Sequence, residues 1–525
     1  MCNFIIMVWG NCMNTLKQRL KHLKFNGLTL VTSVLFIILM ALLVRRQLEL
    51  RFLVEWGDES ETIVVTRMMA AGYRLYSEVY NNHGPLVFLP GFMISRMGNY
   101  GIATYRWIPI VLQWLTLISI YLSPLFKNHL QRIFATSLSG VIIVLFMPLF
   151  YGHTYLYQTM SGLFMIIIFS QYALPILTDK PLNFINIMIG NLLIFSLPFL
   201  AVTNLPFAIL IFVISLRLKN VKAIVSGAII ALIINFGFLL VYGSWDGYIA
   251  YHYYLNSTVL YSGKGIEAFI KTILDFYSKN LTHFITLLII LLATMKLSLK
   301  GSWIHHLANL MLIPMFISLV IRGGLVLTLS GLIYLYALVG LSLVFFDVEF
   351  IESDQIKQVV QLLPLYGVLL VSIYIFYLPQ QADNYYYEFL PETEFSRIVS
   401  RITKPDEKIL ALSFRSYEYL VADRLPASTH FIYLSIQAKY NQKPYKDIYV
   451  SIVDDVKKNR PKAMVIDEWN IIIDESDYWS NYAADLMEYV NEEYYRLEGS
   501  QIYIRKDVNL LDYGLDPYFG YEIIQ

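Results

Sequence analysis

Acidic side chains and a histidine occupy a polar stretch, residues 56–90, between two long apolar segments. The stretch begins with Asp58 and Glu59 and ends in the turn His83-Gly84-Pro85-Leu86. A carboxylate at the face of an apolar bundle can act as a general base, because it can accept a proton from a hydroxyl within hydrogen-bonding reach. The alternative is that these acids only solvate a loop, as exposed acids commonly do.

His83 precedes a Gly-Pro pair, which predicts a sharp turn into a helix that begins at Pro85. The free N–H groups at the start of a helix favour anions, and a histidine beside them can add a donor to a phosphate. A histidine that only caps its own turn is the alternative. Arg322, in a short loop between two apolar segments, could face an anionic head group or simply reach the membrane surface.

The composition indicates that these residues sit on a membrane protein. Of the 525 residues, 57% are hydrophobic and 15% charged, against roughly 25% charged in soluble proteins. The two cysteines, Cys2 and Cys12, precede the first predicted span, so the sequence indicates neither a disulfide framework nor a cysteine metal site. The sequence has no basic stripe with interleaved aromatic residues, so it does not indicate nucleic-acid binding.

The apolar runs predict about eleven transmembrane helices. They cover residues 28–44, 103–125, 133–150, 155–177, 183–200, 203–216, 221–242, 281–297, 303–321, 324–346 and 359–378. The basic short loops favour a cytoplasmic N-terminus in a multi-pass plasma membrane protein. Alternation then places three regions on the extracytoplasmic face: the first loop, 45–101, with two interfacial helices over 62–72 and 84–97; a loop over 243–280; and the chain from 380 onward.

The sequence pattern changes after residue 379, where most of the acidic residues gather. Strands are predicted over 408–414, 430–434 and 463–467, and helices from 417–422 and over 447–459. This alternation predicts an extracytoplasmic α/β domain, residues 380–525, after a transmembrane domain, residues 1–379. No Gly-x-Gly-x-x-Gly follows a predicted strand, so a nucleotide site there is not expected.

With these motifs the chain resembles the GT-C superfamily of membrane glycosyltransferases, which includes protein O-mannosyltransferases and bacterial aminoarabinose transferases. The first matching feature is Asp58-Glu59 after the first span. The second is the run Gly72-Tyr73-Arg74-Leu75-Tyr76-Ser77-Glu78 leading to His83-Gly84-Pro85-Leu86. The third lies in the tail, from Asp406-Glu407-Lys408-Ile409-Leu410 through Tyr417 to Asp423-Arg424-Leu425-Pro426-Ala427-Ser428.

The resemblance implies an inverting enzyme that moves a sugar from a polyprenyl-phosphate donor to an extracytoplasmic glycan, lipid or protein. It implies that Asp58 is the catalytic base and that Glu59 shapes the site or binds a divalent metal where one is used. His83 falls where other members often have a lysine that holds the donor phosphate, and Arg67 or Arg322 could supply the missing positive charge. No metal ligand set is assigned.

Two departures concern the donor contacts. Many members have a glutamate early in the fourth span, where this chain has Tyr157-Gln158-Thr159-Met160. Many have a lysine in the fifth or sixth span, where this chain has Thr203-Asn204. A transporter or flippase, or a non-catalytic cell-envelope assembly protein, is the alternative function. A transporter would favour acids inside spans and paired repeats, which the sequence does not show.

Overall fold

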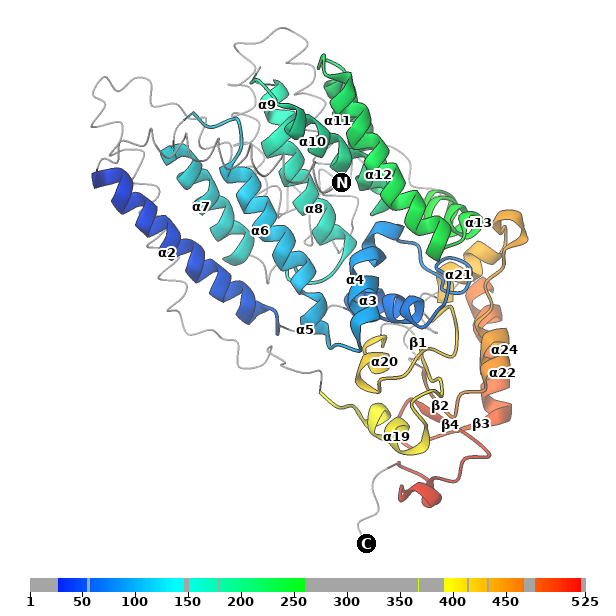
Figure 1. Ribbon diagram of the computed structural model, residues 1–525. Helices are drawn as coiled ribbons and strands as arrows, with labels where there is room; N and C mark the ends of the chain where they lie inside the picture. The colour runs from blue at the N-terminus through cyan, green and yellow to red at the C-terminus, as the bar shows by residue number, and fades with distance from the viewer. Residues whose placement is uncertain are drawn as a thin grey trace.

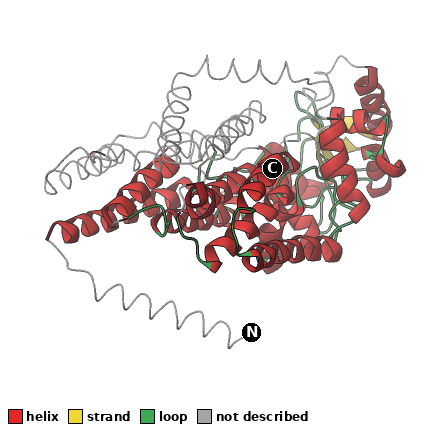
Figure 2. Cartoon of the chain, turned by 90° about the horizontal axis from the view of Figure 1, so that it is seen from above, coloured by secondary structure: helices red, strands yellow, loops and turns green. Residues whose placement is uncertain are grey.

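The computed structural model describes residues 27–53, 57–127, 129–145, 151–177, 180–259, 367, 391–412, 415–431, 434–466 and 477–520. A helical part formed by residues up to 259 lies beside a smaller α/β domain formed by the chain from 391 onward (Figure 1). Seen from above, the strands gather at one end of the molecule and helices make up most of the rest (Figure 2).

The apolar runs of the first half form helices where the sequence predicts spans. They are α2 (Gly27–Leu50), α5 (Ile102–Tyr105), α6 (Trp107–Tyr121), α7 (His129–Leu145), α8 (Tyr157–Ile168), α10 (Phe184–Ser196), α11 (Leu205–Ser215) and α12 (Val221–Tyr242). A π-helical turn, η2 (Phe169–Ala173), and α9 (Leu174–Leu177) extend α8. In the described part of the chain, three helical stretches are long and apolar enough to cross a membrane: Leu30–Leu50, Tyr157–Ile176 and Val221–Tyr242. The spans predicted between 281 and 378 lie outside the described residues.

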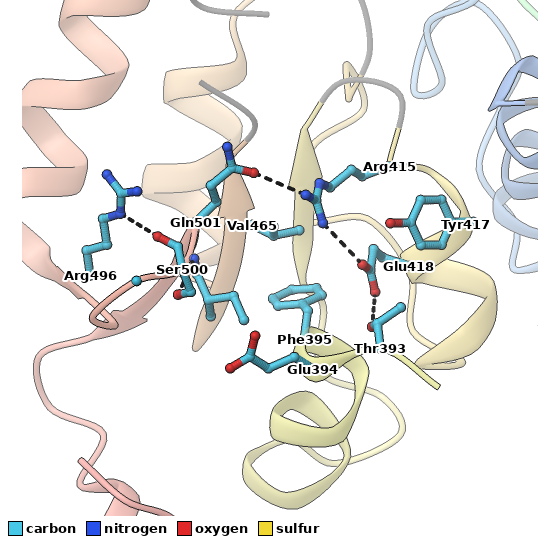
Figure 3. Close-up of a pocket in the computed structure, with 12 residues that line it drawn as sticks. Thr393, Glu394, Phe395, Arg415, Tyr417, Glu418, Val465, Arg496, Ser500 and Gln501 are labelled. Atoms are coloured by element: carbon cyan, nitrogen blue, oxygen red, sulfur yellow. Dashed lines mark hydrogen bonds and ion pairs between the residues drawn. The ribbon is translucent and has the colours of Figure 1, made fainter. Parts of the chain in front are cut away.

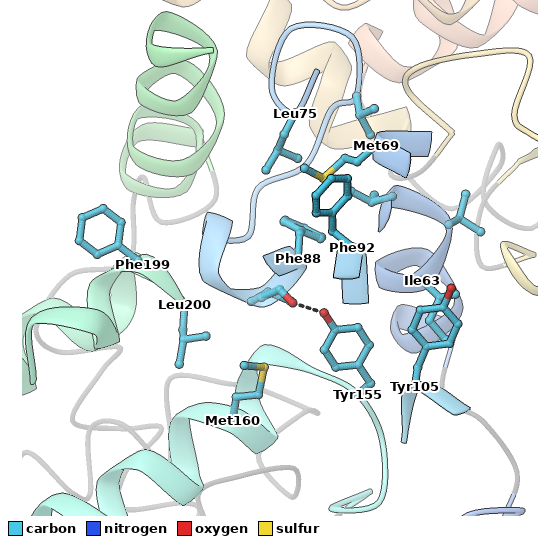
Figure 4. Close-up of a cluster of buried hydrophobic side chains, with 14 of the residues drawn as sticks. Ile63, Met69, Leu75, Phe88, Phe92, Tyr105, Tyr155, Met160, Phe199 and Leu200 are labelled. Atoms are coloured by element: carbon cyan, nitrogen blue, oxygen red, sulfur yellow. Dashed lines mark hydrogen bonds between the residues drawn. The ribbon is translucent and has the colours of Figure 1, made fainter. Parts of the chain in front are cut away.

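The two helices predicted in the first loop are α3 (Gly57–Ala70) and α4 (Pro85–Met97). Helix α3 begins five residues earlier than expected, so Asp58 lies within its first turn. The two helices pack together, with the hydroxyls of Thr66 and Ser95 3.0 Å apart. Side chains of both helices meet Tyr105, Tyr155 and the loop after α10 in one buried cluster (Figure 4). Most of α3 is therefore buried between protein surfaces.

The chain from 391 onward forms a mixed four-stranded sheet of order β1-β2-β4-β3. The strands are β1 (Leu410–Leu412), β2 (Ala463–Ile466), β3 (Tyr494–Arg496) and β4 (Ile502–Arg505), of which β1 and β2 are parallel and the other pairs antiparallel. Leu410 and Met464 pack with α22 (Ile452–Asn459) and α24 (Asp477–Glu493). Ala411 and Val465 point to the other face, toward α19 (Glu394–Ile402).

The strand predicted over 430–434 is wrong. His430 and Phe431 are not in a strand, and α21 (Leu434–Asn441) begins at Leu434. The backbone groups just before this segment are paired elsewhere: Ile409 pairs with Pro426, and the carbonyl of Thr429 accepts a hydrogen bond from the N–H of Tyr80 at 3.0 Å. The helix predicted over 447–459 begins only at Ile452.

The α/β domain docks on both predicted outer loops. The hydroxyl of Tyr254 donates to the carbonyl of Lys443 at 2.8 Å, and Lys446 pairs with Asp246 at 2.7 Å. Tyr254 belongs to a π-helix, η5 (Tyr248–Val259), which follows α13 (Trp245–Gly247). Helix α20 (Tyr417–Val421) packs beside α3. The described parts of the three regions predicted to lie on one face of the membrane therefore contact one another. Which face of the membrane this is stays a prediction.

Candidate active site

Helix α3 presents two carboxylates on one face at its start. Asp58 lies in the first turn, and Glu61 follows three residues later, which places it on the same side of the helix. Asp58 is partly exposed, whereas Glu61 is buried. The N-terminal end of the helix dipole favours negative charge at Asp58.

Glu61 is held in place by Asn81, whose side-chain N–H donates to Oε1 at 2.6 Å. Burial raises the pKa of Glu61 well above its usual value, and the charge of Asp58 raises it further, while Asn81 opposes the shift. Two adjacent carboxylates do not readily ionise together. The arrangement therefore favours a proton on the buried Glu61 and a negative charge on the more exposed Asp58.

Asn81 also connects these carboxylates to the turn that contains His83. Its side-chain oxygen accepts the backbone N–H of His83 at 2.8 Å. The hydroxyl of Tyr76 donates to the carbonyl of His83 at 2.6 Å, and Tyr76 itself has a φ of 67°. The backbone on both sides of the His83 side chain is thus fixed relative to α3.

Gly84 brings this turn against the loop after α10. Its N–H donates to the carbonyl of Leu200 at 3.0 Å. A Cβ atom at position 84 would lie 2.0 Å from the carbonyl oxygen of Phe199. Only glycine fits this close backbone approach.

The ring of His83 lies 4.4 Å from the ring of Tyr157, at the start of α8. Its Nδ1 is buried and makes no hydrogen bond to any residue that the structure describes. Burial lowers the pKa of His83 to about 3, with a further contribution from His252. His83 is therefore neutral near pH 7 and can offer a phosphate a hydrogen bond but no charge.

His252 and Asn256 of η5 hold the same turn from the other side. The side-chain N–H of Asn256 donates to the carbonyl of Asn82 at 2.8 Å. The ring of His252 lies between two backbone carbonyls, with Nδ1 3.1 Å from Asn82 O and Nε2 3.0 Å from Pro198 O. Sequence reasoning missed both residues, because neither belongs to a motif.

Two further polar atoms at the start of α8 lack hydrogen bonds. Oε1 of Gln158 and Oγ1 of Thr159 are buried without a partner among the described residues. Buried polar groups are normally hydrogen-bonded, so these atoms mark a place for water or a polar ligand. The only signal in the sequence was that this segment reads Tyr157-Gln158-Thr159-Met160 where many members of the GT-C superfamily have a glutamate.

Glu59, the neighbour of Asp58, points into the protein. It pairs with Arg106, with Oε2 2.6 Å from Nη2, and its side chain is 0% exposed. The backbone N–H of Tyr155 donates to its Oε1 at 2.8 Å. Since both oxygens are engaged, Glu59 does not fit the role of a metal ligand, and its role in shaping the site stays a prediction.

Of the two predicted phosphate-binding arginines, the structure describes Arg67. Arg67, near the end of α3, contacts Asp423 of the α/β domain at 3.2 Å and the carbonyl of Tyr100 at 3.0 Å. Arg322 lies outside the described residues. Asn204, which stands where many members of the GT-C superfamily have a lysine, donates to Ser161 of α8 at 2.9 Å.

The described residues offer no evident set of ligands for a divalent metal. In the described ranges no group of three His, Cys, Asp or Glu side chains is arranged to hold one. Near Asp58, Glu59 is bound to Arg106 and Glu61 to Asn81.

No family model and no curated protein matches the chain. Solved structures of an oligosaccharyltransferase from the archaeon Archaeoglobus fulgidus are similar to it. One carries a tethered acceptor peptide containing the NVT sequon; it is 12% identical, with a TM-score of 0.45 over 91% of this chain and 74% of that one. Another, AglB with an inhibitory peptide and a dolichol-phosphate, is 12% identical, with a TM-score of 0.41 over 90% and 75%. A third, a complex with Zn and sulfate, is 12% identical, with a TM-score of 0.43 over 91% and 74%.

Proposed function

We propose that the protein is an inverting glycosyltransferase that moves a sugar from a polyprenyl phosphate to an extracytoplasmic acceptor. The observation that carries this proposal is the partly exposed Asp58 beside the buried Glu61, joined through Asn81 to the His83 turn. This arrangement supplies a base at the face of an apolar bundle. The sequence resemblance described above supplies the class of donor.

Asp58 is the proposed general base. As the acceptor hydroxyl attacks the anomeric carbon, its proton passes to the Asp58 carboxylate. The bond between that carbon and the phosphate oxygen breaks, and polyprenyl phosphate leaves with the electron pair. Direct displacement inverts the anomeric centre through a transition state with oxocarbenium character. Because phosphate is a good leaving group, no general acid is needed.

The proposed donor phosphate lies near the His83 turn. A neutral His83 offers one hydrogen bond, and the start of α4 offers a favourable dipole. Gln158 and Thr159 follow Tyr157, whose ring centroid lies 4.4 Å from that of His83. Positive charge would come from Arg322, or from Arg67 after it releases the half-exposed Asp423.

The donor class is tested with purified full-length protein in detergent, supplied with a panel of radiolabelled polyprenyl-phosphate sugars and an extract of cell-envelope acceptors. The proposal expects release of free polyprenyl phosphate with at least one donor. In parallel, proteoliposomes loaded with the same donors measure transport. Movement of donor across the bilayer with no release of polyprenyl phosphate would support the flippase alternative instead.

A further inference from the structure

A cavity of about 440 Å³ opens in the α/β domain, and its lining includes none of the residues of the proposed transfer site. It lies at the edge of the sheet where β1 and β2 end and β4 begins, since Val465 of β2 is paired with Ile502 of β4. In α/β sheets, ligands commonly bind outside the carboxyl ends of parallel strands. The volume falls within the range of small-molecule pockets, roughly 300–1,000 Å³.

A line of polar contacts runs along one wall of this cavity (Figure 3). Arg415 donates to the side-chain oxygen of Gln501 at 3.1 Å, and its Nη1 lies 3.7 Å from Oε1 of Glu418. The other oxygen of Glu418 accepts the hydroxyl of Thr393 at 2.5 Å. Gln501, Arg415, Glu418 and Thr393 thus alternate donors and acceptors along one wall.

Glu418 is the exceptional member of this line. Its side chain is 1% exposed, yet Oε1 accepts no hydrogen bond from the part of the chain that the structure describes. The separation of 3.7 Å from Arg415 is too long for a hydrogen bond. A buried carboxylate oxygen without a donor is costly, and a ligand hydroxyl could satisfy it.

The rest of the lining indicates what kind of ligand fits. Phe395, Val465 and Ile502 supply the apolar part of the lining. Tyr417 lies beside Glu418 (Figure 3). The lining also carries two guanidinium groups and two carboxylates, so it has no net charge that would favour a phosphate. A sugar matches this surface, because its hydroxyls both donate and accept while its C–H faces are apolar.

We propose that this cavity, defined by Gln501, Arg415, Glu418, Thr393, Phe395 and Tyr417, binds one saccharide unit. A ligand hydroxyl donates to Oε1 of Glu418, and its oxygen, or the oxygen of the adjacent hydroxyl, accepts from Arg415. The site is separate from Asp58 and goes beyond the proposed transfer reaction, because binding here needs neither donor nor turnover.

The test is saturation-transfer NMR on the full-length protein in detergent, with methyl glycosides of glucose, galactose, mannose and N-acetylglucosamine as probes. We expect saturation of at least one glycoside, with no competition from inorganic phosphate. Glu418→Gln, which replaces an open acceptor by an amide, should weaken that binding roughly tenfold. The exposed Glu488 supplies the matched control, and Glu488→Gln should bind as the wild type does.

Gln501→Ala, at the partly exposed rim, is a second variant that serves if Glu418→Gln does not fold. Binding should persist in Asp58→Asn, which separates this cavity from the transfer site. Three results would overturn the proposal: no glycoside is saturated, phosphate displaces the bound glycoside, or binding is lost in Asp58→Asn but kept in both cavity variants.

Discussion

Glu59 and Arg106 form a buried ion pair, with Oε2 2.6 Å from Nη2 and side-chain exposures of 0% and 2%. Arg106 also donates to the carbonyl of Arg51 at 2.8 Å and to that of Leu53, just after α2. This pair connects α3 to the end of α2 and the start of α6. The residue beside the proposed base therefore fixes where the base lies.

We predict that Glu59→Gln destabilises the protein by about 3–5 kcal/mol, because it leaves the Arg106 charge buried without its partner. The double variant Glu59→Leu with Arg106→Met should recover much of this loss. Unfolding of the wild type, Glu59→Leu, Arg106→Met and the double variant in detergent forms a double-mutant cycle that measures the coupling energy. Additive losses would contradict a direct pair.

Gly84→Ala should destabilise the turn, since its Cβ would lie 2.0 Å from Phe199 O. The expected cost is roughly 1–3 kcal/mol or more, with loss of transfer activity. Gly101→Ala is the matched control, because a Cβ there meets nothing within 4 Å and the φ of −69° suits alanine. Equal melting temperatures for the two variants would contradict the close approach at Gly84.

The buried Glu61 predicts a dependence of stability on pH. Its pKa is raised in the folded state, so the stability that comes from its protonated form is complete below the unfolded value, about 4.5, and is lost as pH rises through the folded pKa. Glu61→Gln removes this loss. Melting temperatures measured from pH 5 to 9 should fall more steeply for the wild type than for Glu61→Gln, and parallel curves would refute the assignment.

His83 predicts donor binding that does not follow histidine titration. With its pKa lowered to about 3, the ring stays neutral between pH 5 and 8. The KM for the donor should therefore show no step near pH 6.5 in the wild type, as in His83→Gln. A rise in KM through that pH in the wild type alone would show that His83 acts as a cation.

The sequence predicted the helices well where apolar runs are long, and α12 has the predicted bounds of 221–242. It did not predict where α3 begins, because nothing apolar marks its first turn. The strand predicted over 430–434 is wrong, since the segment before it pairs with Tyr80, 349 positions earlier in the chain. Local pattern carries no information on such long-range pairing.

The candidate site was predictable only in part. Asp58 and His83 were singled out from their motifs and from the resemblance, and their roles stay predictions. Adjacent helical residues point in different directions, so Asp58 and Glu59 could not share one role. The partners of the two buried carboxylates come from outside α3: Arg106 pairs with Glu59, and Asn81 donates to Glu61. Such contacts depend on tertiary packing, as does the neutral state of His83.

The role of Asp58 as the base is decided by the rate of polyprenyl-phosphate release by Asp58→Asn, measured beside the wild type and Asp485→Asn. Asp485 is an exposed residue of α24, so the control makes the same chemical change away from the proposed site. A general base contributes about 10²–10⁴-fold to a rate. The account predicts a loss of at least about 100-fold in Asp58→Asn, with unchanged folding and full activity in Asp485→Asn. Wild-type release by Asp58→Asn would contradict it.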